Sequence, residues 1–284
     1  MPLNNMNFVF FGSPKFAKII LENLVKNGYV PSILVCNPDK PVGRKQIITP
    51  PLTKQFILEK SPETKIIQPL KKQNLVDMAL SGEFGDSEFA IVAAYSKIIP
   101  KEVLDVFPKG VIGVHPSLLP KYRGASPIQS MILEGEENIG LTLYLMDEGM
   151  DSGAILAISN FQFPISNFNY TQLEERLAEL GGEMLVKILP DFINGKIKTT
   201  KQDEAQATFT KKFTTEDGFV DLEKDNHILI ERKIRALNPD PGVYAFIDGK
   251  RIKLLEAKIN EDNKVIITKI IPEGKPERLV NIII

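Results

Sequence analysis

Two polar side chains, His115 and Asp151, have the residue types and positions for proton-transfer chemistry. His115 ends the apolar run 111–114 and is one of two histidines among 284 residues. An imidazole can take a proton from an attacking amine, and a facing aspartate orients the ring and favours its charged form. Such a pair suits acyl-type transfer, especially with a donor near the developing oxyanion. The competing interpretations are a histidine that caps its own loop and an aspartate that serves turn chemistry between Gly149 and Gly153.

Other catalytic signatures are absent from the sequence. There is no Gly-x-Ser-x-Gly elbow and no Walker loop, and Phe-Gly-Ser-Pro at 11–14 lacks the dinucleotide-binding glycine pattern. Two histidines and one cysteine do not give the usual zinc spacings, so we expect no metal. Ser117 has no histidine base in a recognisable motif, which makes a serine nucleophile a weak interpretation.

The hydrophobic pattern predicts the elements that position His115. Asn-Phe-Val-Phe-Phe at 7–11 reads as a buried strand, and the strand–helix–strand opening is typical of a parallel crossover unit. His115 then falls at the carboxyl end of a strand, where ligands bind in open parallel sheets. The predicted strands cover residues 7–11, 31–36, 89–94, 111–114, 141–146 and 154–158.

Length and composition predict two unequal domains. We expect a doubly wound α/β domain over residues 1–190, a linker over 191–207, and a small β-rich domain over 208–284. In the last segment, Asp248-Gly249 is a strong hairpin signal and residues 226–237 form a short helix.

The charge pattern limits the partners. The formal net charge is −1, so a polyanion would need locally clustered lysine and arginine side chains. No apolar run is long enough to span a bilayer, the N-terminus lacks a secretory pattern, and Cys36 is the only cysteine, so we expect a cytoplasmic protein. The cationic clusters are Lys40, Arg44 and Lys45 in the irregular segment 37–51, the lysines of the linker, and Arg232, Lys233 and Arg235 in the late helix.

Six stretches carry a resemblance to a known family. His-x-Ser-Leu-Leu-Pro with Arg-Gly just beyond it is specific to formyltetrahydrofolate-dependent formyltransferases. The chain resembles the methionyl-tRNA formyltransferases in particular, over nearly its whole length. The matching stretches are PDKPVGR (38–44), AYSKIIP (94–100), HPSLLPKYRGASPIQ (115–129), MDEGMDSG (146–153), QDEAQAT (202–208) and KIRALNPDPGVY (233–244).

The resemblance implies formyl transfer from 10-formyltetrahydrofolate to the amino group of methionine on initiator tRNA. It implies a Rossmann-like N-terminal domain and a small OB-like β-barrel at the C-terminus. His115 and Asp151 correspond to the catalytic histidine and aspartate, and the loop with Lys40, Arg44 and Lys45 corresponds to the one that reaches the tRNA acceptor end. We expect a monomer without a membrane contact. The residues that correspond to the folate-binding segment are Ser117, Leu118, Leu119 and Pro120.

One departure from the family pattern lies at Gly113. The family has an asparagine two positions before its catalytic histidine, and its amide would donate to the formyl oxygen as that becomes an oxyanion. Glycine has no donor, and removal of one such donor costs about 3 kcal/mol, on the order of a hundredfold to a thousandfold in rate. We therefore expect a slowed enzyme, which Gly113→Asn would accelerate, unless water or another side chain replaces the amide. The C-terminal domain is also short for the family, so its barrel could be incomplete.

Two alternative functions stay open. A sugar-nucleotide N-formyltransferase would share the His-x-Ser-Leu-Leu-Pro core and the same donor, but it would not need PDKPVGR or IRALNPDPG. A non-catalytic folate- or tRNA-binding homologue would explain Gly113.

Overall fold

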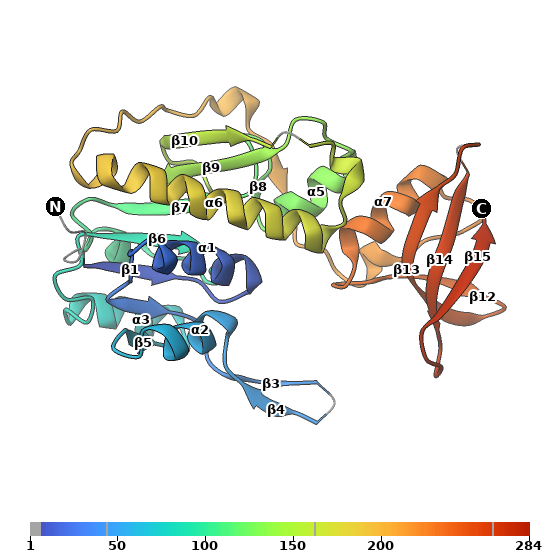
Figure 1. Cartoon of the computed structure of the whole chain (residues 1–284), viewed down its shortest axis with the longest axis horizontal. Coiled ribbons are helices and arrows are strands. Elements are labelled where there is room, and N and C mark those ends of the chain that lie inside the picture. The colour runs from blue at the N-terminus through green and yellow to red at the C-terminus, as the bar shows by residue number, and fades with distance from the viewer. Residues whose placement is uncertain (1–6, 44, 162, 263) are drawn as a thin grey trace. The chain divides into compact units, whose positions relative to one another are not determined.

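The protein divides into two compact units. This computed structural model describes residues 7–43, 45–161, 163–262 and 264–284 (Figure 1). The first unit comprises Met1–Arg123, Gly140–Phe161 and Glu175–Ala207, and the second comprises Gly124–Ile139, Gln162–Glu174 and Thr208–Ile284. Residues 191–207, expected as a linker, thus lie within the first unit, and two segments expected in the first domain lie in the second. A division by chain order misses such segments because the chain crosses between the units several times.

A seven-stranded sheet forms the centre of the first unit. Its order is β10-β9-β7-β6-β1-β2-β5, which runs from top to bottom in Figure 1. The five strands from β5 to β7 are mutually parallel, whereas β9 is antiparallel to β7 and β10 is antiparallel to β9. The strands are β1 (Phe8–Phe11), β2 (Ile33–Val35), β5 (Lys65–Ile67), β6 (Phe89–Ala93), β7 (Val111–His115), β9 (Gly140–Leu145) and β10 (Ile155–Asn160).

Helices cover both faces of this sheet, which explains why its central strands are apolar without alternation. The helix α6 packs closely against β7, β9 and α1, since a Cβ atom at Gly181 would lie 3.0–3.5 Å from Leu141, Val114 and Ile20. The helices of the chain are α1 (Lys15–Lys26), α2 (Leu52–Lys60), α3 (Lys72–Leu80), α4 (Lys101–Leu104), α5 (Pro127–Glu134), α6 (Tyr170–Ile193) and α7 (His227–Leu237), with 3₁₀ turns at Ile165–Asn167, Glu204–Gln206 and Glu216–Gly218.

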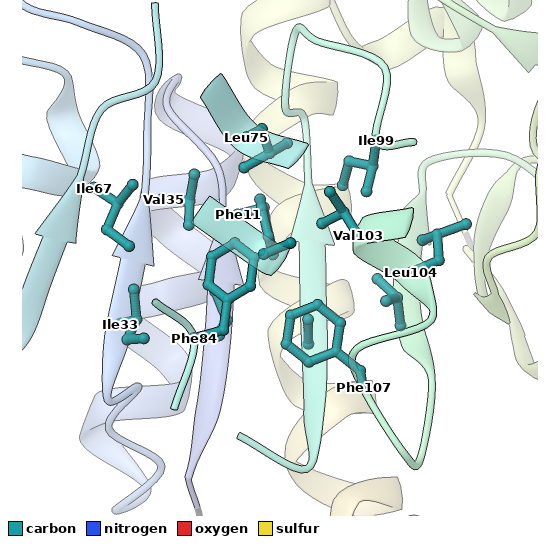
Figure 2. Close-up of a cluster of buried hydrophobic side chains, with 14 residues drawn as sticks. Phe11, Ile33, Val35, Ile67, Leu75, Phe84, Ile99, Val103, Leu104 and Phe107 are labelled. Atoms are coloured by element: carbon teal, nitrogen blue, oxygen red, sulfur yellow. The ribbon is translucent and has the colours of Figure 1, made fainter. Parts of the chain in front are cut away.

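The opposite face carries a hydrophobic cluster under α3 and α4 (Figure 2). Phe11 lies at its centre and makes edge-to-face contacts with Phe84 and Phe107. The cluster extends along the sheet to Val111 of β7. Because side chains alternate along a strand, Gly113 and His115 lie on the same face as Val111, next to this core.

Residues 40–42 and 47–49, expected as part of an irregular segment, form two paired strands of a β-hairpin. The strands β3 (Lys40–Val42) and β4 (Ile47–Thr49) pair antiparallel and extend away from the large sheet in Figure 1. Their side chains are mostly exposed. Neither strand alternates cleanly between apolar and polar residues, so the local pattern did not indicate this pairing.

The second unit contains a four-stranded antiparallel meander packed on α7. Asp248 and Gly249 both have positive φ and connect β12 to β13, as the hairpin signal predicted. Among the described residues β12 does not pair with β15, so this sheet is an open meander, which agrees with the incomplete barrel that the short C-terminal segment indicated. The strands are β12 (Val243–Ile247), β13 (Lys250–Ile259), β14 (Val265–Pro272) and β15 (Arg278–Ile283), and a separate short pair joins β8 (Arg123–Gly124) to β11 (Phe209–Thr210).

Reciprocal hydrogen bonds between Asn169 and Gln172 form a cap at the start of α6. Asparagine is a favoured N-cap residue, and the helix begins at Tyr170. Of the helices in the described ranges, none is both long and apolar enough to cross a bilayer.

Candidate active site

Two neighbouring strands bring four residues to one face of the sheet. Gly113 pairs with Tyr144, and His115 pairs with Thr142, across the antiparallel β7–β9 ladder. Residues paired in this way point to the same face. His115 ends β7 and is 6 % exposed, and Tyr144 is 4 % exposed, so both side chains are held within the fold.

His115 is oriented by a backbone oxygen. Its Nε2 lies 2.8 Å from the carbonyl oxygen of Tyr122. A carbonyl can only accept, so Nε2 carries the proton and Nδ1 is the basic nitrogen of the neutral ring. Tyr122 has φ of 61°, a left-handed conformation that is costly for a bulky residue. The fold thus holds a strained residue at the point that fixes the imidazole tautomer.

The basic nitrogen of His115 faces the carboxylate of Asp151. Nδ1 and Oδ2 lie 3.6 Å apart, which is an electrostatic contact and too long for a hydrogen bond. Both atoms are acceptors while the ring is neutral, which accounts for the gap. A proton taken up at Nδ1 would create an imidazolium directly opposite the carboxylate.

Asp151 reaches His115 from the loop that follows β9. Because β9 is antiparallel to β7, the two residues do not lie at the same end of the sheet by strand direction alone. Instead, the loop after β9 folds back over the face of the sheet, and Asp151 itself has φ of 50°. Gly153 is required for this path because a Cβ atom there would lie 1.7 Å from the oxygen of Leu145. The glycine is needed for close approach, while Asp151 adopts the left-handed turn conformation.

A buried polar relay holds the Asp151 loop in place. The side-chain amide of Gln202 donates to the backbone oxygens of Asp151 and Gly153, both at 2.8 Å. The Oε1 atom of Gln202 accepts from Nε and Nη2 of Arg123, which also forms a two-pronged ion pair with Glu204. Arg123 is 2 % exposed. Its guanidinium lowers the pKa of Glu204.

The Tyr144 hydroxyl also contacts the carboxylate of Asp151. It donates to Oδ1 of Asp151 at 2.6 Å, while Oδ2 faces His115. Burial, reinforced by the charge of Asp151, raises the pKa of Tyr144 well above its usual value of 10. The phenol therefore remains a proton donor through the neutral range.

The segment after His115 is braced from within. Thr142 donates to the oxygen of Ser117 and accepts from the amide of Leu119. The Ser117 hydroxyl donates to the carbonyl of Lys121, and both Ser117 and Leu119 are buried. Leu118 lies against Gly140, where a Cβ atom would come within 2.5 Å of its side chain. This segment therefore offers a fixed backbone, with Leu118 and Pro120 less enclosed than their neighbours.

The chain matches two formyl transferase families in sequence. Residues 6–189 match "Formyl transferase", and residues 212–280 match "Formyl transferase, C-terminal domain". A methionyl-tRNA formyltransferase of Campylobacter curvus is 42 % identical over 258 residues, which cover 90 % of this chain and 81 % of the relative. One of Chloroflexus aurantiacus is 38 % identical, covering 89 % and 80 %.

The chain belongs to the methionyl-tRNA formyltransferase family. It is thus an enzyme of the formyl-transferring type, as the motifs around His115 indicated.

Solved structures of formyltransferases share this fold. A methionyl-tRNA formyltransferase from Clostridium thermocellum has a TM-score of 0.62 at 17 % identity, covering 98 % of this chain and all of that one. An N-formyltransferase from Helicobacter canadensis, solved with folinic acid and dTDP-3-aminofucose, has a TM-score of 0.67 at 18 % identity, covering 93 % and 95 %. The Rossmann-like first unit and the antiparallel second sheet agree with the fold class expected from the sequence.

The structure gathers some of the expected site residues and separates others. His115, Asp151 and Gly113 lie together, and the segment 117–120 follows directly. Lys40 and Lys45 are exposed on the β3–β4 hairpin, and Arg44 lies outside the described residues.

The three cationic residues of α7 are engaged within the second unit. Arg232 donates to the carbonyls of Leu133 and Glu134 and so satisfies backbone oxygens at the C-terminal end of α5. Arg235 pairs with Glu231, and Lys233 donates to the oxygen of Phe219. Of the cationic clusters named from the sequence, the hairpin lysines and the linker lysines are exposed, so the hairpin is a better candidate for a polyanion contact than α7.

Sequence reasoning missed the residues that support the site. Thr142 and Tyr144 are polar positions within an apolar strand, two residues apart, and this pattern would have placed them on one face of that strand, although not opposite His115. Gln202 and Arg123 belong to matching stretches, but Gln202 was assigned to a linker because its neighbours are charged and lack periodicity. In the described ranges, no three His, Cys, Asp or Glu side chains cluster closely enough to hold a metal ion.

Proposed function

We propose that this chain transfers a formyl group from 10-formyltetrahydrofolate to the amino group of methionyl-initiator tRNA. The proposal rests above all on His115 and Asp151, which face each other beside a braced Ser-Leu-Leu-Pro segment in a chain of this family. The relatives named methionyl-tRNA formyltransferase support the same substrate pair.

The chemistry requires one proton to leave the attacking amine. The amine nitrogen forms a bond to the formyl carbon, the oxygen gains negative charge, and the bond from that carbon to the folate nitrogen then breaks. His115 takes the amine proton at Nδ1, and Asp151 stabilises the imidazolium through the 3.6 Å contact. The same proton is available to the departing folate nitrogen, so the step balances without another reactant.

The folate donor is proposed to lie along residues 117–120. Ser117 and Leu119 turn their side chains into the fold, so recognition there falls to the backbone and to Leu118 and Pro120. A rigid backbone is suited to this because it costs little ordering on binding.

The tRNA partner is proposed to contact the β3–β4 hairpin. Lys40 and Lys45 are exposed there, and lysine side chains bind the phosphate backbone by electrostatic attraction. A cytoplasmic monomer remains our expectation, since charged initiator tRNA is the substrate.

An acceptor comparison tests the proposal. The purified chain is supplied with 10-formyltetrahydrofolate and either methionyl-tRNA or an amino-sugar nucleotide, and the formylated product is measured by mass spectrometry. We expect formyl transfer to the methionyl-tRNA and none to the sugar. Transfer to the sugar alone would identify a sugar N-formyltransferase, and binding of both tRNA and folate without product would identify a non-catalytic homologue.

A further inference from the structure

We propose that Tyr144 is a positioning residue for Asp151 and forms one functional unit with Gly113. In this unit the tyrosine ring takes the space of a side chain at position 113, and its hydroxyl donates to Asp151. The inference rests on the proposed formyl transfer and names the device that supports its catalytic pair.

The first observation is steric. A Cβ atom at Gly113 would lie 2.3 Å from Cε1, 2.5 Å from Cζ and 2.8 Å from the hydroxyl oxygen of Tyr144. Atoms do not approach so closely without displacement. The end of the tyrosine ring therefore occupies the volume that a side chain at position 113 would fill. The absence of a side chain at Gly113 is therefore what allows Tyr144 to occupy this position.

The second observation is polar. The Tyr144 hydroxyl donates to Oδ1 of Asp151 at 2.6 Å, and Oδ2 remains directed at Nδ1 of His115. Hydrogen bonds to ionised groups are among the stronger ones in proteins. The phenol thereby fixes which carboxylate oxygen meets the imidazole.

Different contacts hold the backbone and the side chain of Asp151. Asp151 adopts a left-handed backbone conformation, and its backbone oxygen is held by Gln202. That hydrogen bond fixes the main chain, whereas the Tyr144 hydroxyl constrains the side chain itself. Removal of the hydroxyl should leave the loop in place and remove the hydrogen bond that orients Oδ1.

A simpler interpretation makes Tyr144 a filler of the space above Gly113. Its ring is buried, and the carboxylate would then be an incidental partner of the hydroxyl. The two interpretations differ in what Tyr144→Phe does, because phenylalanine keeps the ring and removes only the hydroxyl.

The first experiment measures kcat and KM of formyl transfer for Tyr144→Phe. We expect kcat to fall about tenfold to a hundredfold, the range for removal of one hydrogen bond to a charged group, with KM for folate and tRNA within about twofold of the parent. Tyr170→Phe is the matched control, since the Tyr170 hydroxyl also donates to a carboxylate, that of Glu174, outside the site. We expect it to retain kcat. An unchanged kcat in Tyr144→Phe would overturn the inference.

The second experiment tests the unit with three variants: Gly113→Asn, Tyr144→Leu and the two together. Asparagine alone collides with the ring, so we expect Gly113→Asn to lower kcat. Leucine alone leaves no polar group, so it lowers kcat as well. The double variant gives asparagine the vacated space, and we expect its kcat to exceed that of either single variant by about tenfold or more, a non-additive result. Additive decreases would overturn the pairing.

These outcomes are separable from a failure of the proposed function. If the unmodified chain forms no formylmethionyl-tRNA, the proposed function itself fails. If it forms product and Tyr144→Phe forms it equally fast, only the role of Tyr144 fails.

Discussion

The side chain of Gln202 donates to the backbone oxygen of Asp151 at 2.8 Å and thereby ties a segment near residue 200 to the catalytic loop. The same amide reaches the oxygen of Gly153, and its own oxygen accepts from the buried Arg123. A residue that looks like part of a polar linker is thus a central support of the site.

Gln202→Leu should damage both stability and rate. It would leave two backbone oxygens and part of the Arg123 guanidinium without their partners. Each unsatisfied group costs about 1–3 kcal/mol, so we expect the free energy of unfolding to fall by about 2–4 kcal/mol and kcat to fall with it. Denaturant unfolding and steady-state kinetics measure the two effects. Gln206→Leu, an exposed position in the same segment, is the control and should change unfolding by less than about 0.5 kcal/mol.

His115→Ala should remove proton transfer and leave binding. General-base catalysis contributes about a hundredfold to ten-thousandfold, so kcat should fall within that range while KM for the folate donor stays close to that of the parent. His227→Ala provides the control, because His227 is exposed in the first turn of α7. Equal activity of the two histidine variants would argue against the assignment of His115.

The hairpin lysines should govern the salt dependence of tRNA binding. With Lys40 and Lys45 both replaced by alanine, we expect weaker binding and a shallower plot of log K against log salt. The slope should change by about one unit for each phosphate that is no longer neutralised. Lys109→Ala is the control, since Lys109 pairs with Glu88 beside the start of β7. A slope unchanged in the double variant would remove the hairpin from the tRNA interface.

The buried thiol of Cys36 should make the free energy of unfolding decrease as the pH rises above 9. Burial raises the pKa of its thiol from 9.0 to about 12. Because the folded value lies above the unfolded one, the contribution is complete below pH 9 and is lost as the pH rises toward 12, at about 1.4 kcal/mol per unit. We expect Cys36→Ala to show a smaller decrease in unfolding free energy between pH 8 and 10 than the parent. An identical decrease would mean that the thiol does not titrate on unfolding.

The sequence predicted the strands of the large sheet other than β5 because their signals were local. Strands such as β1 and β7 are continuous apolar runs, and Asp248-Gly249 specifies its turn by backbone conformation. The position of His115 followed from strand polarity alone. The short C-terminal segment indicated an incomplete barrel, but not which strands stay unpaired, because closure depends on pairing between distant strands.

The parts of the site that the sequence did not reveal depend on tertiary register. Tyr144 meets Gly113 only because β9 runs antiparallel to β7 with that particular pairing. Without knowledge of that register, the sequence shows only that Gly113 lacks the amide donor of an asparagine side chain. The expectation that Gly113→Asn alone accelerates the enzyme is therefore replaced by one in which Tyr144 must change as well.

Formyl groups transferred per enzyme molecule measure the central claim most directly. Methionyl-tRNA and 10-formyltetrahydrofolate are mixed in excess over the chain, and the formylated methionine released from the tRNA is quantified by mass spectrometry. We predict more than one formyl group transferred per molecule of the parent chain and a sharply reduced rate with His115→Ala. Product no higher than in a mixture without the protein would contradict formyl transfer by this chain.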